Sequence, residues 1–145
     1  MGLYDGACVF CQIAAGNTPA DIVYADTESV AFLDNRPLFP GHVLLCPREH
    51  YETITDLPPK LSGPMITTTQ LLAKAVQTAL NAEGTFIAIN NRVSQTVPHL
   101  HIHVVPRKRR DGLRGFFWPR QRYKDEASRE AVRQAIEREV QKLRA

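Results

Sequence analysis

The heptapeptide His99-Leu100-His101-Ile102-His103-Val104-Val105 says more about the fold of this chain than any other stretch. Histidine and apolar residues alternate along it, and in a β-strand successive side chains point to opposite faces. The alternation predicts a strand over 99–105, with the apolar residues against a core and the three imidazoles in a row on the other face. Two chemical interpretations of the row are open: a site that grips a catalytic metal from one side, or an imidazole nucleophile that its neighbours tune.

Turn and helix signals on either side of this strand predict the remaining elements. Pro58-Pro59 opens a long helix that extends to about Glu83, and a last helix starts at about Asp125. A short helix is predicted over 8–15, and further strands are predicted over 22–25, 29–34, 42–46 and 85–90. This order favours an α+β fold, in which a five-stranded antiparallel sheet carries its helices on one side. The open face and edges of such a sheet invite a second subunit.

The length and composition fit one soluble domain. The chain has 145 residues, 43% of them hydrophobic and 23% charged, which is enough to bury a core of ordinary size. No apolar run approaches the roughly 20 residues that a membrane span needs, and the first residues do not resemble an export signal. We therefore expect a single domain over 1–145 in the cytoplasm, without a membrane role.

Positive charge is concentrated just after the histidine row. The net charge is only +3, but the following basic residues stand close together in the sequence: Arg107, Lys108, Arg109, Arg110, Arg114, Arg120, Arg122 and Lys124. The cluster is open to three interpretations, which are a nucleic-acid surface, a field that attracts phosphorylated small molecules, and a solvated basic loop. We do not expect nucleic acid to be a partner.

A longer motif encloses the histidine row: Gln95-Thr96-Val97-Pro98-His99-Leu100-His101-Ile102-His103-Val104-Val105-Pro106-Arg107. Further segments precede it, namely 8–13 with Tyr24, then 31–34, then 40–44, then His50 before Asp56-Leu57. In order and spacing these residues resemble the signature of the histidine-triad (HIT) family. The resemblance covers about residues 7–107, the triad core, and leaves an arm and helix over 108–145 as the more individual part of the chain.

The resemblance implies a nucleotidyl hydrolase or transferase of the Hint and Fhit type, with a HIT-like fold, a homodimeric assembly and no organic cofactor. Such an enzyme cleaves at the α-phosphate of dinucleoside polyphosphates or nucleoside phosphoramidates through a covalent nucleotidyl-histidine. The implied catalytic residues are His101 as nucleophile, His103 and His42 as groups that orient and polarise the site, and Thr96. The residues implied to contact the AMP-containing purine nucleotide are Asp34 at the ribose hydroxyls, Gln95 with Thr96 at the phosphate oxygens and leaving group, and Asn90 and Phe32.

Cys8 and Cys11 stand at the spacing of a metal half-site, which needs two more ligands. His50 and His99 are the candidates, and a redox role is disfavoured because no thioredoxin-like βαβ pattern surrounds the cysteines. In the metal-bearing branch of the HIT superfamily, ligands resembling these four bind structural zinc. The resemblance therefore implies that Zn²⁺ supports His99 from outside the reaction, so the three histidines have different roles.

Two alternative functions and two departures from the family pattern accompany this interpretation. The alternatives are a protein that senses nucleotides without converting them, and a hydrolase that holds a catalytic metal on the histidine row. The loop over 90–94, before Gln95, is short and has no glycine, which leaves its backbone less freedom to wrap a phosphate. In the tail, Trp118 either reaches the active site of a partner subunit or packs with the C-terminal arm.

Overall fold

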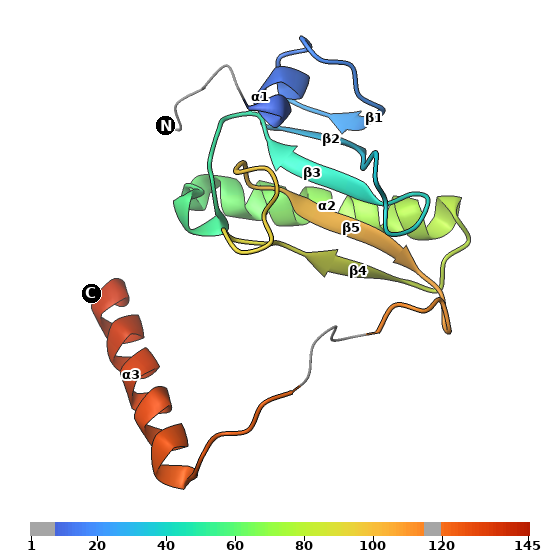
Figure 1. Ribbon diagram of the computed structural model, residues 1–145. Coiled ribbons are helices and arrows are strands. Elements are labelled where there is room, and N and C mark those ends of the chain that lie inside the picture. Colours follow the sequence, from blue (N-terminus) through green and yellow to red (C-terminus); the bar gives the residue numbers. More distant parts are fainter. Residues whose placement is uncertain (1–7, 115–119) are drawn as a thin grey trace. The chain divides into compact units, whose positions relative to one another are not determined.

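The structure, a computed structural model, describes residues 8–114 and 120–145. The chain divides into two compact units, Met1–Asp111 and Gly112–Ala145. The first contains α1 (Val9–Ala14), β1 (Ile22–Ala25), β2 (Ser29–Leu33), β3 (Val43–Pro47), η1 (Ile54–Asp56), α2 (Pro59–Ala79), β4 (Gly84–Ala88) and β5 (Ile102–Arg107), and the second contains α3 (Glu126–Arg144) (Figure 1). The single domain over 1–145 stays a prediction. Within the described residues, no helix is long and apolar enough to cross a bilayer.

The five strands form one sheet in the order β1-β2-β3-β5-β4, and every neighbouring pair is antiparallel. This confirms the predicted α+β fold. Opposite residues of an antiparallel pair share a face of the sheet. The register places Phe32 opposite Leu44 and Leu44 opposite His103, so these three side chains mark one face. Ala31 and its partners on β3 and β5 mark the other.

Helix α2 lies along the face of Ala31 (Figure 1). It begins at Pro59, which the first helical position accepts because the amide there needs no partner within the helix. Its buried residues recur at helical spacing: Met65, Thr68, Thr69, Leu72 and Val76. The apolar members of this row join alternate residues of β2, β3 and β5 in one core cluster.

Helix α1 packs on the opposite face of the sheet, where Phe32 and Leu44 lie. Its buried residues Phe10 and Cys11 belong to a second core cluster together with those two side chains. The prediction that the helices gather on one side is therefore wrong. The reason is that every residue of β2 except the last is buried, and every residue of β3 is buried. Both faces of these strands therefore carry side chains that pack against other elements.

β5 begins at Ile102, so the predicted strand is wrong for its first three residues. The ring Nε2 of His99 lies 2.8 Å from the carbonyl oxygen of Pro47, the last residue of β3. The His99 side chain thus occupies the carbonyl of Pro47 that a main-chain N–H would bind if the pairing of β3 and β5 extended further. The N–H of Leu100 donates instead to the carbonyl of Tyr51, at 2.6 Å. Two of the three histidines therefore precede the strand, and one lies within it.

Helix α2 also ends earlier than predicted, at Ala79 rather than near Glu83. Asn81 adopts a left-handed backbone conformation with φ of 51°, which is a common way to end a helix. The N–H of Glu83 then pairs with the carbonyl of Arg107, at 2.9 Å, next to the start of β4. The bounds of β1 to β4 agree with the predicted ranges within two residues.

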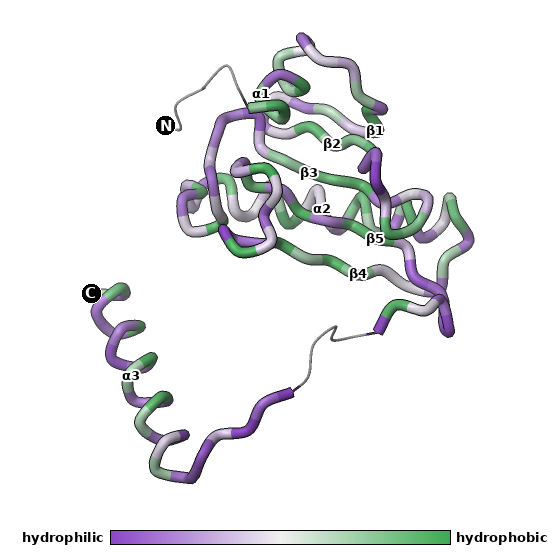
Figure 2. The backbone as a smooth tube through the Cα atoms, viewed as in Figure 1, coloured by the Kyte–Doolittle hydropathy of each residue, from purple (hydrophilic) through white to green (hydrophobic). Residues whose placement is uncertain are grey.

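The second unit contains the amphipathic helix α3. It begins after Asp125, as predicted, and the carboxylate of Asp125 accepts a hydrogen bond from the N–H of Ser128 at 2.7 Å. Along one side, Arg133 pairs with Glu130 and Glu137. Figure 2 shows hydrophobic residues recurring along the helix between hydrophilic ones; the large ones, exposed within the described residues, are Val132, Ile136, Val140 and Leu143.

Candidate active site and metal centre

A cavity of about 520 Å³ lies on the sheet face that α1 covers. Its apolar lining consists of Val9, Phe10, Ile13, Pro19, Ala20, Phe32, Leu33, Leu44 and Val97. Its polar lining consists of Asp21, Asp34, Asn35, Arg36, Thr96, His101 and His103. A concave apolar wall facing a few convergent polar groups is typical of a small-molecule site.

His101 is buried at the wall of this cavity. Its ring Nδ1 lies 2.7 Å from the carbonyl oxygen of His99. A carbonyl oxygen only accepts hydrogen bonds, so the proton of a neutral His101 ring lies on Nδ1 and Nε2 keeps its lone pair. Burial lowers the pKa of His101, which favours the neutral form. The arrangement leaves one ring nitrogen of His101 free to act as a nucleophile.

His103 lies beside His101 and is held by His42. Nδ1 of His103 is 2.9 Å from Nε2 of His42, and Nδ1 of His42 accepts a hydrogen bond of 3.1 Å from the N–H of Leu38. Burial, assisted by the neighbouring imidazoles of His101 and His42, lowers the pKa of His103 to about 4. Burial also lowers the pKa of His42, although the Asp34 carboxylate, 3.7 Å away, opposes this. Both rings are therefore neutral near pH 7.

The structure brings some of the predicted substrate-binding residues to the cavity and leaves others away from it. Phe32, Asp34 and Thr96 line it together with His101 and His103, whereas His42 lies behind His103 and is not part of the lining. Among the described residues that form this lining, neither Asn90 nor Gln95 is found. Asn90 is half-buried, and its contact with substrate remains a prediction. The substrate contact of Gln95 also remains a prediction.

The side chain of Gln95 is engaged in its own loop. Its Nε2 donates to the carbonyl of Glu52 at 2.6 Å, and its Oε1 accepts from the N–H of Arg92 at 2.7 Å. Arg92 and Ser94 have φ values of 68° and 61°, a left-handed conformation that residues other than glycine rarely adopt. The loop therefore makes its tight turn without glycine, and the amide of Gln95 is part of what holds it there.

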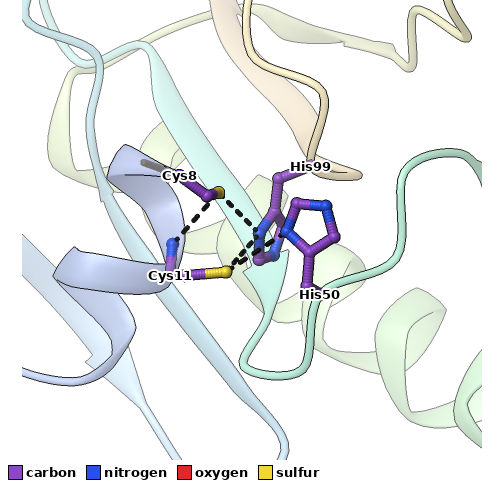
Figure 3. Close-up of side chains that lie close together, drawn as sticks. All are labelled: Cys8, Cys11, His50 and His99. Atoms are coloured by element: carbon purple, nitrogen blue, oxygen red, sulfur yellow. Dashed lines mark hydrogen bonds between the residues drawn. The ribbon is translucent and has the colours of Figure 1, made fainter. Parts of the chain in front are cut away.

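A second cluster of polar side chains contains Cys8, Cys11, His50 and His99 (Figure 3). Nδ1 of His99 lies 3.4 Å from Sγ of Cys8 and 3.4 Å from Sγ of Cys11, and Nδ1 of His50 lies 3.2 Å from Sγ of Cys11. The four side chains come from the start of α1, the segment after β3 and the segment before β5. All four predicted metal ligands thus converge on one point.

This donor set fits a tetrahedral zinc ion. All four ligand atoms lie within 4.8 Å of one another, and ordinary Zn–S and Zn–N bonds set tetrahedral ligands roughly 3.3–3.8 Å apart. The hydrogen bond between Nε2 of His99 and the carbonyl of Pro47 puts the ring proton on Nε2 and leaves Nδ1 as the ligand atom. Burial lowers the pKa of His99 to about 4, which keeps that nitrogen unprotonated.

Asp34, His42 and His103 form another group whose ligand atoms lie within 4.8 Å of one another. Their donor set does not suit a metal. Nδ1 of His42 already accepts the N–H of Leu38, and its Nε2 faces His103. The three histidines of the row likewise point their nitrogens at different partners, so they do not converge on one ion.

Sequence reasoning missed the part of the cavity wall that α1 contributes. Val9 and Ile13 are four residues apart and therefore share a side of the helix. This spacing was the sequence feature that could have predicted an apolar wall on α1. Phe10 contacts both clusters: its ring centroid lies 5.0 Å from that of His101 and 6.0 Å from that of His99. The main-chain donor at Leu38 has no signal in the sequence, because any residue except proline supplies an N–H.

The basic stretch after the row is partly paired. Nε of Arg107 donates to the carboxylate of Asp111 at 2.6 Å, and Arg109 pairs with Glu83. These two side chains belong to local ion pairs, in keeping with the interpretation of a solvated loop. Trp118 lies outside the described residues.

Comparisons with known proteins agree with this geometry. A family model described as the HIT domain matches residues 15–110. An uncharacterised HIT-like protein of Mycobacterium tuberculosis is 42% identical over 108 residues, 73% of this chain and 75% of that protein. The adenylylsulfatase HINT3 of Arabidopsis thaliana is 36% identical over 108 residues, 73% of this chain and 55% of that protein. The crystal structure of a zinc-bound histidine-triad protein from Mycobacterium smegmatis has a TM-score of 0.71 and 38% identity, and the match covers 86% of this chain and 89% of that one. This chain belongs to the HIT family.

Proposed function

We propose that this protein is a nucleotidyl hydrolase or transferase that works through a covalent nucleotidyl-His101. The observation that carries the proposal is the 2.7 Å hydrogen bond between Nδ1 of His101 and the carbonyl of His99, at the wall of the cavity. It leaves Nε2 with a lone pair, so the nucleophile needs no separate base. The adenylylsulfatase activity in the name of the Arabidopsis relative supports a reaction at an adenylyl group.

The reaction has two displacements at the α-phosphorus of a dinucleoside polyphosphate or a nucleoside phosphoramidate. Nε2 of His101 attacks first: a P–N bond forms, the P–O or P–N bond to the leaving group breaks, and its electron pair departs with that group. The leaving group takes up a proton from solvent as it departs. Water then attacks the phosphorus and gives up a proton, the bond to His101 breaks with its electron pair returning to Nε2, and the nucleoside monophosphate is released. His103 donates a ring N–H to a phosphoryl oxygen on which charge develops, and Thr96 contacts the phosphate or leaving group.

The remaining cavity residues bind the AMP portion of the substrate. The carboxylate of Asp34 accepts hydrogen bonds from the ribose hydroxyls, and the purine lies against Phe32 and the apolar wall. A volume of about 520 Å³ lies within the range of small-molecule sites. Gln95 reaches a phosphate only if its amide leaves the loop contacts described above, and Asn90 needs a similar shift of the loop.

Zn²⁺ is the second part of the proposal, with Cys8, Cys11, His50 and His99 as its ligands. Bound there, the ion supplies a structural cross-link rather than reaction chemistry. Its ligands would come from the start of α1, the segment after β3 and the start of the triad. The bound zinc of the Mycobacterium smegmatis relative supports this assignment.

A homodimer in the cytoplasm is the proposed state of the protein. Support comes from the outer strand β1, where Ile22 and Val23 expose about half of their surface, because open apolar strand edges favour a partner. Light scattering on the purified chain tests the assembly. A monomer at micromolar concentration would contradict it.

The deciding experiment traps the intermediate. The protein is mixed with adenosine phosphoramidate, diadenosine triphosphate or diadenosine tetraphosphate, quenched, and examined by mass spectrometry for an adenylyl group on His101. His101→Ala should lose the adduct and reduce turnover on the order of 10⁴-fold or more. Binding of AMP without any adduct or turnover would favour the nucleotide sensor. Turnover without adduct that a chelator abolishes would favour the metal-dependent hydrolase.

A further inference from the structure

A single main-chain donor lies behind the pair formed by His42 and His103. The loop between β2 and β3 turns back so that the N–H of Leu38 points at Nδ1 of His42, at 3.1 Å. We propose that this amide is a positioning group that sets the tautomers of both histidines, so that His103 presents a ring N–H to the cavity.

The loop that carries this amide is held at several points. The N–H of Asp34 bonds to the carbonyl of His42 at 2.9 Å, and the N–H of His42 bonds to the carbonyl of Phe39 at 3.0 Å. The N–H of Arg36 bonds to a carboxylate oxygen of Asp34 at 2.9 Å. Gly41, with φ of 97°, supplies the left-handed turn just before His42. These contacts therefore fix the direction in which the N–H of Leu38 points.

The first consequence concerns His42. A main-chain N–H can only donate, so Nδ1 of His42 must offer a lone pair, and a neutral ring then carries its proton on Nε2. Asp34 alone would favour the opposite arrangement, because its carboxylate lies 3.7 Å from the same Nδ1 and can only accept. The amide of Leu38 thus decides which ring nitrogen of His42 is protonated.

The second consequence concerns His103. Its Nδ1 faces Nε2 of His42 at 2.9 Å, and one of these two nitrogens must donate while the other accepts. Because Nε2 of His42 carries the proton, Nδ1 of His103 accepts and the proton of His103 lies on Nε2. His103 lines the cavity, so the series of hydrogen bonds from Leu38 through His42 to His103 ends in a hydrogen-bond donor at the cavity. If these hydrogen bonds ran in the opposite direction, Nε2 of His103 would present a lone pair, which repels a phosphoryl oxygen.

Only the use of the His103 proton on a phosphoryl oxygen rests on the proposed function. The tautomers themselves belong to the free protein, and their measurement needs no substrate. If the expected tautomers are present but no nucleotidyl adduct forms on His101, the result counts against the proposed function and not against this inference.

The test is nitrogen NMR of the imidazoles in the full-length, zinc-loaded protein at pH 7, with ¹⁵N-labelled histidine. The chemical shifts of the two ring nitrogens distinguish the tautomers. We expect His42 and His103 both to be protonated on Nε2. Protonation of His42 on Nδ1, or of His103 on Nδ1, in the wild-type protein would overturn the inference whatever the variants show.

Two variants then examine the amide. Leu38→Pro removes the N–H, and Leu38→Ala keeps it while truncating a side chain that is 53% exposed. Leu38→Ala should keep the wild-type tautomers. A folded Leu38→Pro protein should show His42 partly protonated on Nδ1, and it should form the nucleotidyl adduct at least about 10-fold more slowly, as expected when a phosphate donor is lost. Wild-type tautomers in folded Leu38→Pro would overturn the inference.

Discussion

The two outer histidines of the triad have the same ring and a similar pKa but different surroundings. Burial lowers the pKa of His99 and that of His103 to about 4. His99 is enclosed by two thiols and the carbonyl of Pro47, whereas His103 is held by His42 and lines the cavity. A shifted pKa therefore identifies both as buried bases, and only the partner atoms distinguish the proposed metal ligand from the group proposed to contact substrate.

The two ends of the triad are joined by one short connection. The main-chain carbonyl of His99 accepts the Nδ1 hydrogen bond of His101, while the side chain of His99 belongs to the cluster of Cys8, Cys11, His50 and His99. Changes at the His99 end should therefore act mainly on stability and metal content. Changes at the His103 end should act mainly on the reaction.

Replacing His103 should produce the largest difference between the two ends. His103→Ala removes the ring N–H at the cavity, and we expect adduct formation on His101 to slow by about 10²–10³-fold. Zinc content should stay near the wild-type value, because no proposed metal ligand is changed. Rapid-quench mass spectrometry and elemental analysis measure the two effects. His103→Gln, whose amide can donate from a similar position, should recover part of the rate. Loss of zinc in His103→Ala would contradict the division of roles.

Replacing a thiol should give the opposite result. Cys11→Ser should weaken zinc binding by more than the roughly 10- to 100-fold that loss of an outer-sphere partner costs, and it should lower Tm. At low temperature the folded fraction should still form the adduct.

Cys46→Ala is the matched control for the thiol. Cys46 is buried in the same core cluster as Cys11, and burial raises its pKa, but it is not among the four convergent ligands. It should lose stability without losing zinc. Equal zinc content in Cys11→Ser and the wild type would refute the metal centre.

The sequence predicted the His103 end of the triad better than the connection between the ends. Alternation placed Ile102 on the α2 face of β5 and His103 on the other. It could not show that the strand would begin only at Ile102, because that depends on the His99 side chain binding a carbonyl of β3 far away in the sequence. Spacing alone gave half of the metal ligands, Cys8 and Cys11.

Main-chain groups and packing across the sheet account for most of what the sequence left out. The donor at Leu38 has no side-chain pattern, and the position of α1 depends on both faces of the sheet being apolar. Gln95 shows the same limit, since the family resemblance implied a phosphate contact while its amide bonds to the main chain of Glu52 and Arg92.

Acid should destabilise the protein in part through His103. Its pKa is about 4 in the folded state and close to 6.5 when unfolded. Between these values the unfolded chain binds more protons, so the free energy of unfolding should fall as the pH drops from about 6.5 to 4. Urea unfolding at several pH values measures the slope. His103→Asn, which does not titrate, should show a shallower fall. An unchanged slope in that variant would mean that His103 contributes nothing to it.

The smallest expected effect concerns the loop that borders the cavity. Gln95→Ala removes two hydrogen bonds to main-chain groups on the surface, and we expect the free energy of unfolding to fall by about 1 kcal/mol. The rate of adduct formation should stay close to that of the wild type if the amide remains in the loop. Gln95→Glu separates the two bonds, because it keeps the acceptor for the N–H of Arg92 and loses the donor to the carbonyl of Glu52. A loss of rate above about 10-fold in both variants would show that Gln95 leaves these contacts to bind the phosphate. Gln95 would then join His103 among the groups that act on the substrate.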